Sequence, residues 1–522
     1  MLSRSAFTRF QPSRVLYVRN LTTKHQPSGP LAGLKILDLS RILAGPSATM
    51  LMGDMGATVI KVERPKAGDD TRRYAPPYLQ KSDGVDSDIA AYFSSCNRNK
   101  FSVALNFTTK EGQAVIKRLL SQADVVVENF KTGTLDKYGL GPEQVAKEFP
   151  SVVYCSITGF GHTGPYKERP AYDMLIQAMG GSMSITGVPD GEPMKMGLSM
   201  FDLTAGLHAV IGILSALRNK ELTGLGQHVD IAMLDVSVAL LQNQGMNYLA
   251  KKERQKRVGN NHPNVVPYQV MPASDGHFIL TASNDEQFEK FCKVAGKEDL
   301  MQDERFNTMK ARVVNRPHVT PALNEITKTR PTNWWLRKLE AAGVGVAPIL
   351  HPDEVFADPQ VLSRGMLIEM QPPGCEKPVS LIGSPMKFSR TPVNYRIPPV
   401  RVGEHTDPVL LASGFTQAEI DEYRSKGAVG EMPPPMEISE EAYVVDPQGN
   451  QVPGKTWADM RSVSVPVAGA YVDAPKDSGA PKPKPDGMPM VGGAQISGRT
   501  WEALKSVSVP SAAAAFMGKD QK

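Results

Sequence analysis

The chain has 522 residues, too many for one ordinary core, so we expect two domains with appendages. Hydrophobic residues make up 41% and charged residues 22%, which is typical of a soluble globular protein, and no uninterrupted apolar run approaches the roughly 18 residues of a membrane span. The net charge of +5 lies entirely in residues 1–29, so the neutral remainder gives no electrostatic case for a nucleic-acid partner.

Residues 1–29 have the composition of a targeting segment. The stretch MLSRSAFTRFQPSRVLYVRN carries an arginine at every fifth position among Ser, Thr and apolar residues, and it has no acidic residue. This pattern is typical of a mitochondrial transit peptide, and the apolar run of a secretory signal is absent. We therefore expect a mitochondrial matrix protein; the alternative is a disordered basic tail.

Strand and helix patterns alternate from residue 30 to about 226. The predicted strands lie at 34–39, 57–63, 101–107, 124–130 and 151–158, and the predicted helices at 47–56, 110–123 and 141–150. Continuous Val and Ile runs separated by helices indicate a parallel sheet that is covered on both faces.

The pattern then changes along the chain. A long apolar helix is predicted at 201–220, a strand followed by a helix at 227–250, and a charged connector at 251–268. The next block has a strand at 277–283 and helices at 285–296 and 332–343. We divide the chain into a transit peptide (1–29), a large domain (30–226, completed by about 389–426), a linker (227–268), a small domain (269–388) and a low-order tail (427–522).

The tail is rich in Pro and Gly and contains an internal repeat. GKTWADMRSVSVP at 454–466 returns as GRTWEALKSVSVP at 498–510. Two copies are too few for a solenoid. The repeat is either a pair of docking motifs built on Trp457 and Trp501 or a duplicated disordered tail, and we favour the second.

A dinucleotide motif is present but in the wrong context. GFGHTG at 159–164 matches G-x-G-x-x-G and follows a strand, but PYKERP comes next. Pro165 and Pro170 prevent the smooth helix whose N-terminus a dinucleotide needs. The glycines instead suit a tight turn that delivers Asp173 to the end of the sheet.

Asp173 precedes a short helical pattern, with Met174, Leu175, Ala178 and Met179 on one apolar face. An Asp at this position is most often a helix N-cap. The alternative is a chemical role, and the residues of this stretch alone favour the cap.

Four segments now point to a family. They are GLKILDLSRILAGPSATMLMGDMGATVIKVERPKAGDDTR (33–72), ADVVVENFKTGTLDKYGL (123–140), SITGFGHTGPYKERPAYD (156–173) and GEHTD (403–407). Together they resemble the class III CoA-transferases, the group of formyl-CoA and carnitine CoA-transferases. The resemblance implies an α/β fold with a large Rossmann-like domain and a smaller α+β domain, in an interlocked homodimer.

The resemblance also assigns chemistry. Asp173 stands at the family's catalytic Asp, which implies that it forms an anhydride with the acyl donor and then an aspartyl-CoA thioester. Coenzyme A thioesters are substrates, and we expect no permanently bound cofactor and no metal. The mitochondrial branch, together with the leader, implies transfer from succinyl-CoA to a dicarboxylate such as glutarate.

Individual contacts carry over from the family onto matching positions. The coenzyme A groove would be lined by Ile42, Ala44, Arg64, Leu105, Asn129, Phe130 and Lys137. Lys137 stands where formyl-CoA transferase has an arginine, so it keeps the charge but loses the bidentate fork. The candidates for oxyanion donors or a lid over the site are Gly180, Gly181, Gly259 and Asn260.

Two other functions remain open. A methylacyl-CoA racemase of the same fold needs a His partner for its Asp, and here Tyr172 stands beside Asp173 with only His162 nearby. The other is a non-catalytic coenzyme A scaffold. A dicarboxylate acceptor needs a cation for its second carboxylate, and Arg98, Lys195 and Arg254 are candidates that the sequence does not rank.

Overall fold

The computed structural model describes residues 29–82, 85–431, 443–445 and 451–453. The expected transit peptide and both copies of the tail repeat lie outside these residues.

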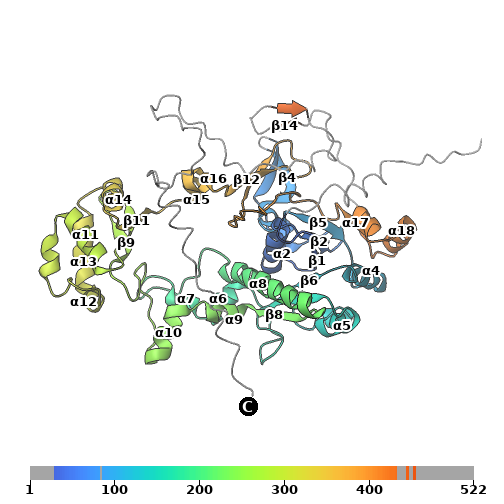
Figure 1. The fold of residues 1–522 in the computed structure, drawn as a ribbon, viewed down its shortest axis with the longest axis horizontal. Helices are drawn as coiled ribbons and strands as arrows, with labels where there is room; N and C mark the ends of the chain where they lie inside the picture. The colour runs from blue at the N-terminus through green and yellow to red at the C-terminus, as the bar shows by residue number, and fades with distance from the viewer. Residues whose placement is uncertain (1–28, 83–84, 432–442, 446–450, 454–522) are drawn as a thin grey trace, which may run out of the picture. The chain divides into compact units, whose positions relative to one another are not determined.

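The centre of the fold is a six-stranded sheet in which every neighbouring pair is parallel (Figure 1). Its strands in spatial order are β5 (Lys100–Ala104), β2 (Thr58–Glu63), β1 (Lys35–Asp38), β6 (Val125–Glu128), β7 (Val153–Thr158) and β8 (His228–Ala232). Numbered along the chain, this is the order 3-2-1-4-5-6 of the dinucleotide-binding fold. The expected parallel sheet is confirmed, and the predicted strands are shortened by one to three residues.

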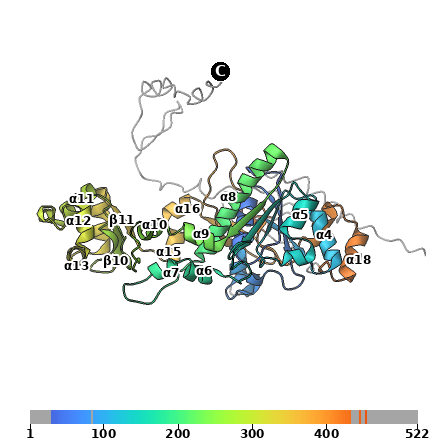
Figure 2. The same ribbon diagram turned by 90° about the horizontal axis from the view of Figure 1, so that it is seen from below.

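Both faces of the sheet are buried. Val125 and Val127 of β6 point into one core and Val126 into the other, as the twofold repeat of a strand requires. Figure 2 shows the sheet edge-on between its two helical layers. The first layer contains α2 (Ala44–Asp54), α6 (Asp173–Met179), α8 (Met200–Thr223) and α9 (Met233–Ala239); the second contains α4 (Lys110–Leu120), α5 (Pro142–Glu148), α17 (Thr406–Ala412) and α18 (Gln417–Ser425).

The strand β8 corrects one boundary. The range 227–268 was expected to be a linker, but β8 at its start is the edge strand of the main sheet and pairs with β7. The sheet needs this strand to cover β7, so the large domain extends past residue 226.

The helix α8 confirms the long apolar helix predicted at 201–220. Among the described residues it is the one helix whose length and composition would suit a membrane span. However, Phe201, Ala205, Ala209 and Ile213 form a buried stripe that packs in the core with α2 and β7. These four residues of α8 are therefore core residues of this domain.

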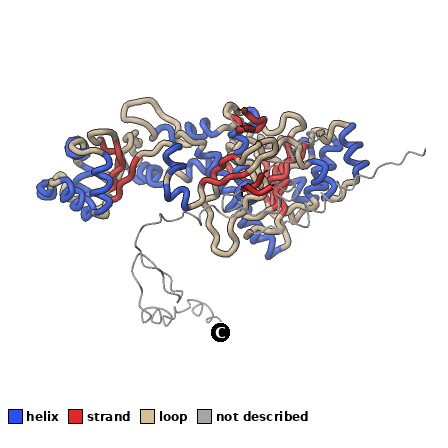
Figure 3. The backbone as a smooth tube through the Cα atoms, turned by 90° about the horizontal axis from the view of Figure 1, so that it is seen from above, coloured by secondary structure: helices blue, strands red, loops and turns tan. Residues whose placement is uncertain are grey.

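A second block has its own core. The antiparallel sheet contains β9 (Tyr268–Pro272), β10 (His277–Thr281) and β11 (Gly345–Pro348). Its helices are α11 (Asp285–Ala295), α12 (Met309–Val314), α13 (Arg316–Thr327) and α14 (Thr332–Ala341), with η3 (Glu298–Gln302) between them. Figure 3 shows these strands beside their helices, and Phe278, Phe291 and Trp335 stack at the centre. This is the smaller α+β domain.

The remaining elements are short. Two hairpins are formed by β3 (Tyr78–Ser82) with β4 (Val85–Ala90) and by β12 (Leu367–Met370) with β13 (Val379–Ile382), and β14 (Tyr443–Val445) pairs with β15 (Gln451–Pro453). The short helices are η1 (Asp70–Arg73), α3 (Ala91–Ser94), η2 (Leu135–Tyr138), α7 (Ser182–Ile185), α10 (Gln242–Lys251), α15 (Pro352–Ala357) and α16 (Pro359–Ser363).

Candidate active site

The strand order of the main sheet reverses between β1 and β6, and the loops that follow these two strands meet. Ligands of open parallel sheets bind outside the carboxyl ends of the strands at such a point. The Asn129 side chain, after β6, accepts from the Arg41 N–H at 2.8 Å and donates to the Arg41 carbonyl at 2.7 Å. The topology therefore brings together the two segments that the sequence assigned to the coenzyme A groove.

Asn129 and Phe130 shape this place in different ways. The Asn129 amide, which was expected to contact coenzyme A, is occupied by the backbone of Arg41. The Phe130 ring lies 5.9 Å from the Arg41 guanidinium, and its N–H donates to the Glu128 carboxylate at 2.8 Å. Both residues thus fix Arg41.

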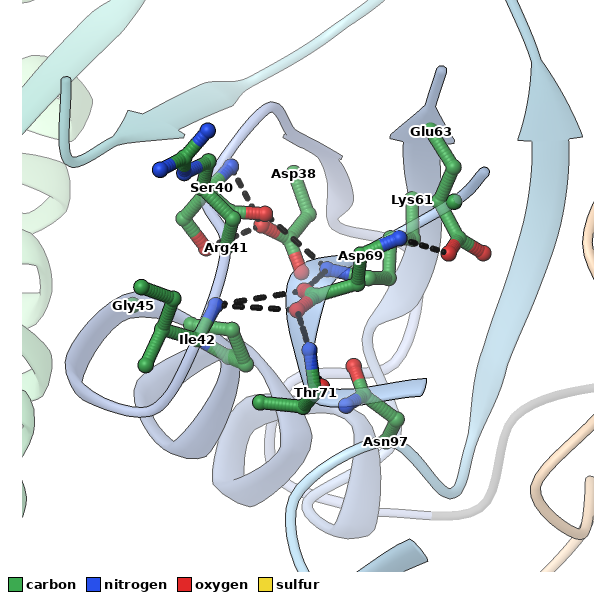
Figure 4. Close-up of polar contacts among 12 residues, drawn as sticks. Asp38, Ser40, Arg41, Ile42, Gly45, Lys61, Glu63, Asp69, Thr71 and Asn97 are labelled. Atoms are coloured by element: carbon green, nitrogen blue, oxygen red, sulfur yellow. Dashed lines mark hydrogen bonds and ion pairs between the residues drawn. The ribbon is translucent and has the colours of Figure 1, made fainter. Parts of the chain in front are cut away.

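The turn from Ser40 to Ile42 has an unusual backbone, shown in Figure 4. Ile42 has φ of 70°, a left-handed conformation that a β-branched residue rarely adopts and that costs on the order of 1–3 kcal/mol. Side chains bind every polar backbone group of the turn. Besides Asn129, these side chains are Asp38, Lys61, Asp69 and Cys96.

A cavity of about 420 Å³ opens beside this turn. Its lining residues are Arg41, Ile42, Asp70, Arg73, Tyr74 and Tyr172. Three guanidinium groups converge on the Asp70 carboxylate: Arg41 at 3.3 Å, Arg64 at 2.7 Å and Arg73 at 3.2 Å. One carboxylate cannot neutralise three cations, so the mouth of the cavity carries an excess of positive charge that suits phosphate groups.

The other residues expected in the groove divide into three groups. Ile42 lines the cavity, and Arg64 reaches its edge through Asp70. Ala44 is buried at the start of α2, and Leu105 is a core residue packed under the sheet. Lys137 is exposed on η2. Sequence reasoning missed Arg41 and Arg73, whose only signal was their position beside Ile42 and Asp70.

Asp173 is the first residue of α6, and Tyr172 occupies the N-cap position. The Asp173 carboxylate is buried and accepts from the Phe201 N–H at 2.7 Å and from the Asp202 N–H at 3.3 Å, at the start of α8. Its second oxygen accepts from the Gln177 side chain. Asp173 therefore ties down the N-terminus of α8, not that of its own helix.

The predicted apolar face of α6 is exposed. Met174, Leu175 and Met179 are exposed, whereas Asp173, Ile176 and Gln177 are the buried residues. The helix has only seven residues, and the polar pair at its start and on its next turn faces α8. This arrangement holds the carboxylate in one rotamer beside Tyr172, which lines the cavity.

Asp202 places a second carboxyl group beside Asp173. Burial and the Asp173 charge raise the pKa of Asp202 to about 7 from its ordinary value of 3.8. The α8 N-terminus thus carries a carboxylate and a carboxyl group that titrates near neutral pH.

We expect Asp202→Asn to stabilise the fold in a pH-dependent way. Between about pH 4 and 7 the folded chain binds more protons at this group than the unfolded chain, so the stability of the wild type falls as the pH rises through that window. The neutral amide removes this loss, a gain on the order of 2–4 kcal/mol at pH 8 that shrinks towards pH 5. Urea denaturation at both pH values measures it, and an equal gain at both would contradict the assignment.

The glycines proposed as oxyanion donors are engaged elsewhere. The Gly180 N–H donates to the Ile176 carbonyl and closes α6, and the Gly259 N–H donates to the Gly187 carbonyl. Gly181 has φ of 89° and is the N-cap residue of α7. Asn260 is exposed. Gly180 and Gly259 therefore hold loops together in this conformation.

The loop before Gly259 is anchored by Arg257. Its guanidinium donates to the carbonyls of Ser184, Val188 and Gly191. The segment expected to form a lid is thus fastened to the loop after α7.

The three cations considered for the acceptor's second carboxylate have different surroundings. Arg98 is buried and bound to both oxygens of Asp54 and to the Ile382 carbonyl, so its expected availability is wrong. Lys195 is exposed and precedes Met196, whose N–H donates to Gln177 at 2.8 Å. Arg254 is exposed. The residue after Lys195 is therefore linked to Asp173 through the Gln177 side chain.

The racemase alternative gains no support from His162. The backbone N–H of His162 donates to the Asp230 carboxylate, and the centre of its ring lies 4.8 Å from the centre of the His228 ring on β8. In the described part of the chain, no group of His, Cys, Asp and Glu is arranged to hold a metal ion.

The fold and this site can now be set beside known proteins. Residues 31–406 match the model of CoA-transferase family III. The chain belongs to this family and is a CoA-transferase.

The most similar relatives agree in the reaction that their names describe. The chain is 44% identical over 387 residues to the succinate–glutarate CoA-transferase of Agrobacterium fabrum, covering 73% of this chain and 95% of that protein. It is 40% identical over 401 residues to the human succinyl-CoA:glutarate CoA-transferase, covering 77% and 90%. A crystal structure of a CaiB/BaiF family protein from Brucella suis is 46% identical, with a TM-score of 0.66, and covers 74% of this chain and 100% of that one.

Proposed function

We propose that the chain moves coenzyme A from succinyl-CoA to a dicarboxylate such as glutarate, with Asp173 as the nucleophile. The observation that carries this proposal is the 44% identity to a succinate–glutarate CoA-transferase along 95% of its length. The buried carboxylate follows Tyr172, which lines the cation-rimmed cavity, and this placement agrees with the proposal.

The reaction proceeds in four exchanges on one carboxylate. An Asp173 oxygen attacks the thioester carbon of succinyl-CoA and the C–S bond breaks. The coenzyme A thiolate departs, and a mixed anhydride of Asp173 and succinate is formed. The thiolate attacks the aspartyl carbonyl and expels succinate. Glutarate then attacks the resulting aspartyl thioester, expels the thiolate and forms an Asp173–glutaryl anhydride. The thiolate finally attacks the glutaryl carbonyl of this anhydride, which releases glutaryl-CoA and the free Asp173 carboxylate.

The α8 N-terminus suits the middle exchanges. When a nucleophile adds to the aspartyl carbonyl, negative charge grows on an oxygen of Asp173 itself. The N–H groups of Phe201 and Asp202 already face that oxygen, so they would stabilise the developing charge without rearrangement. They replace Gly180 and Gly259 as the oxyanion donors that we propose.

The direct test is a substrate screen with the purified chain. Succinyl-CoA is incubated with a panel of mono- and dicarboxylic acids, and the acyl-CoA products are measured by mass spectrometry. We expect transfer to glutarate to exceed transfer to a monoacid of similar length. Deuterium incorporation at the α-carbon of a branched acyl-CoA without coenzyme A exchange would favour the racemase instead, and coenzyme A binding with no turnover would favour the scaffold.

Lys195 is our candidate for the second carboxylate of the acceptor. We expect Lys195→Met to raise the KM for glutarate about tenfold, because the proposed ion pair with its second carboxylate is lost, and to leave the KM for succinyl-CoA within twofold. Arg254→Met is the matched control, since it removes a cation from the other exposed candidate position. Equal effects of both substitutions would reject this role.

We further propose a homodimer in the mitochondrial matrix. The exposed Leu203, Leu207 and Ile211, four residues apart on α8, form an uncovered apolar stripe that a second copy would bury. Sedimentation equilibrium tests the dimer. Import of the full chain into isolated mitochondria tests residues 1–29.

A further inference from the structure

The turn beside the cavity is held by a buried ion pair that the proposed chemistry does not use. Lys61 and Asp69 have side chains that are 2% and 1% exposed, and their charged atoms are 2.9 Å apart. Neither residue lines the cavity. A buried ion pair is weak evidence for stability, because an apolar pair of similar volume often serves as well. Its location therefore calls for another explanation.

The two charged side chains bind backbone groups at both ends of the turn. The Lys61 ammonium donates to the Ser40 carbonyl at 2.9 Å, and the Asp69 carboxylate accepts from the Ile42 N–H at 3.1 and 3.2 Å. Figure 4 shows Asp69 lying against the Ile42 N–H, with the Thr71 N–H bound to the same carboxylate. The pair thus spans the three residues whose middle member is Arg41.

The Lys61–Asp69 pair holds a strained backbone conformation at Ile42. Ile42 is left-handed, and a β-branched side chain destabilises that conformation. If the Ile42 N–H lost Asp69, the ordinary right-handed or extended conformations would be favoured. Either one would turn Arg41 and the entry to α2 in a new direction, and Arg41 carries one of the guanidinium groups at the cavity mouth.

We propose that Lys61 and Asp69 are positioning residues for coenzyme A, which hold Ile42 left-handed and so aim Arg41 at the bound nucleotide. This inference rests on the proposed function, because it takes the cavity to be the coenzyme A site. The pair acts on the substrate through the turn and touches no reacting atom.

The charges of Lys61 and Asp69 stabilise each other's ionised form. Burial by itself would raise the pKa of Asp69, but the Lys61 charge and the Thr71 N–H outweigh it and hold that pKa well below the ordinary range. Burial by itself would lower the pKa of Lys61, but Asp69 and Asp38 outweigh it and raise that pKa. Both shifts favour the ionised forms, so the pair stays charged near neutral pH.

The test removes the pair and then relieves the strain. The double variant Lys61→Met/Asp69→Ala removes both charges together with the acceptor of the Ile42 N–H, and it leaves no unpaired ion. We expect its Kd for coenzyme A and its KM for succinyl-CoA to rise at least tenfold, with the KM for glutarate within twofold. Adding Ile42→Gly, which tolerates the left-handed conformation, is expected to recover at least threefold of that loss. Adding Ile42→Ala instead, which removes the same bulk but not the strain, recovers less.

A matched control separates positioning from general damage. Arg98→Met/Asp54→Asn removes another buried ion pair of the same domain that is bound to no part of the turn. We expect it to lower the melting temperature and leave the KM for succinyl-CoA within twofold. If both pairs raise this KM equally, or if Ile42→Gly recovers nothing, the inference is overturned.

The remaining outcomes are also decisive. If the double variant does not fold, Asp69→Asn alone keeps an oxygen for Ile42 but loses the charge, and a smaller rise of the KM for succinyl-CoA is expected, with the KM for glutarate within twofold. If neither variant folds, the pair is a stability element and the inference fails. If the wild type binds no coenzyme A by calorimetry, it is the proposed function that fails.

Discussion

Asp173→Asn is expected to lower kcat at least about 10³-fold while the chain still folds and binds coenzyme A. The amide keeps an oxygen that accepts from the Phe201 and Asp202 N–H groups, so the α8 N-terminus stays capped. It cannot attack a thioester. Product formation is measured by mass spectrometry and coenzyme A binding by calorimetry.

This substitution separates the two roles that the sequence left open. Asp173→Ala removes the nucleophile and the cap together, and we expect an additional loss of stability of about 1–2 kcal/mol. Were the carboxylate only a cap, Asp173→Asn would retain most of its turnover. Hydroxylamine trapping gives independent evidence. Hydroxylamine converts an anhydride or thioester of Asp173 into a hydroxamate, and it does not react with a free carboxylate.

Arg98→Ala is expected to destabilise the fold by about 3–5 kcal/mol, because it leaves the fully buried Asp54 without its main charge partner. Burial raises the pKa of Asp54 even with Arg98 present, and loss of the Arg98 charge would raise it further. Thermal denaturation followed by circular dichroism measures the loss.

A second variant tests the cause of that loss. Arg98→Met/Asp54→Asn removes both charges, and we expect it to recover much of the stability that Arg98→Ala loses. A folded Arg98→Ala variant with unchanged stability and a raised KM for glutarate would instead restore Arg98 as an acceptor contact.

Much of the large domain follows from local pattern. The Val-Val-Val run of β6 predicts a strand buried on both faces, and its residues do alternate between two cores. The order of the strands does not follow from periodicity, because pairing across the sheet depends on contacts far apart in the sequence. The family resemblance supplied the Rossmann-like fold, and the structure gives its order.

The site is less predictable for a physical reason. Asp173 was found because it lies in a family segment, but its partners at the start of α8 are 28 and 29 residues away in the chain. Arg64 and Arg73 lie close to Asp70 in the chain, but Arg41 reaches the same carboxylate only when the turn after β1 folds onto it. Neither the contact of Asp173 with α8 nor that of Arg41 with Asp70 leaves a local pattern.

The β5 edge of the main sheet is completed by residues from the far end of the domain. The Ala104 N–H donates to the Thr406 hydroxyl, the Gly430 N–H donates to the Ala104 carbonyl, and Leu410 of α17 fills the core beneath. During synthesis, β5 therefore leaves the ribosome some 300 residues before its cover does. The nascent chain exposes an apolar edge for most of its translation, and a chaperone has that interval in which to hold it.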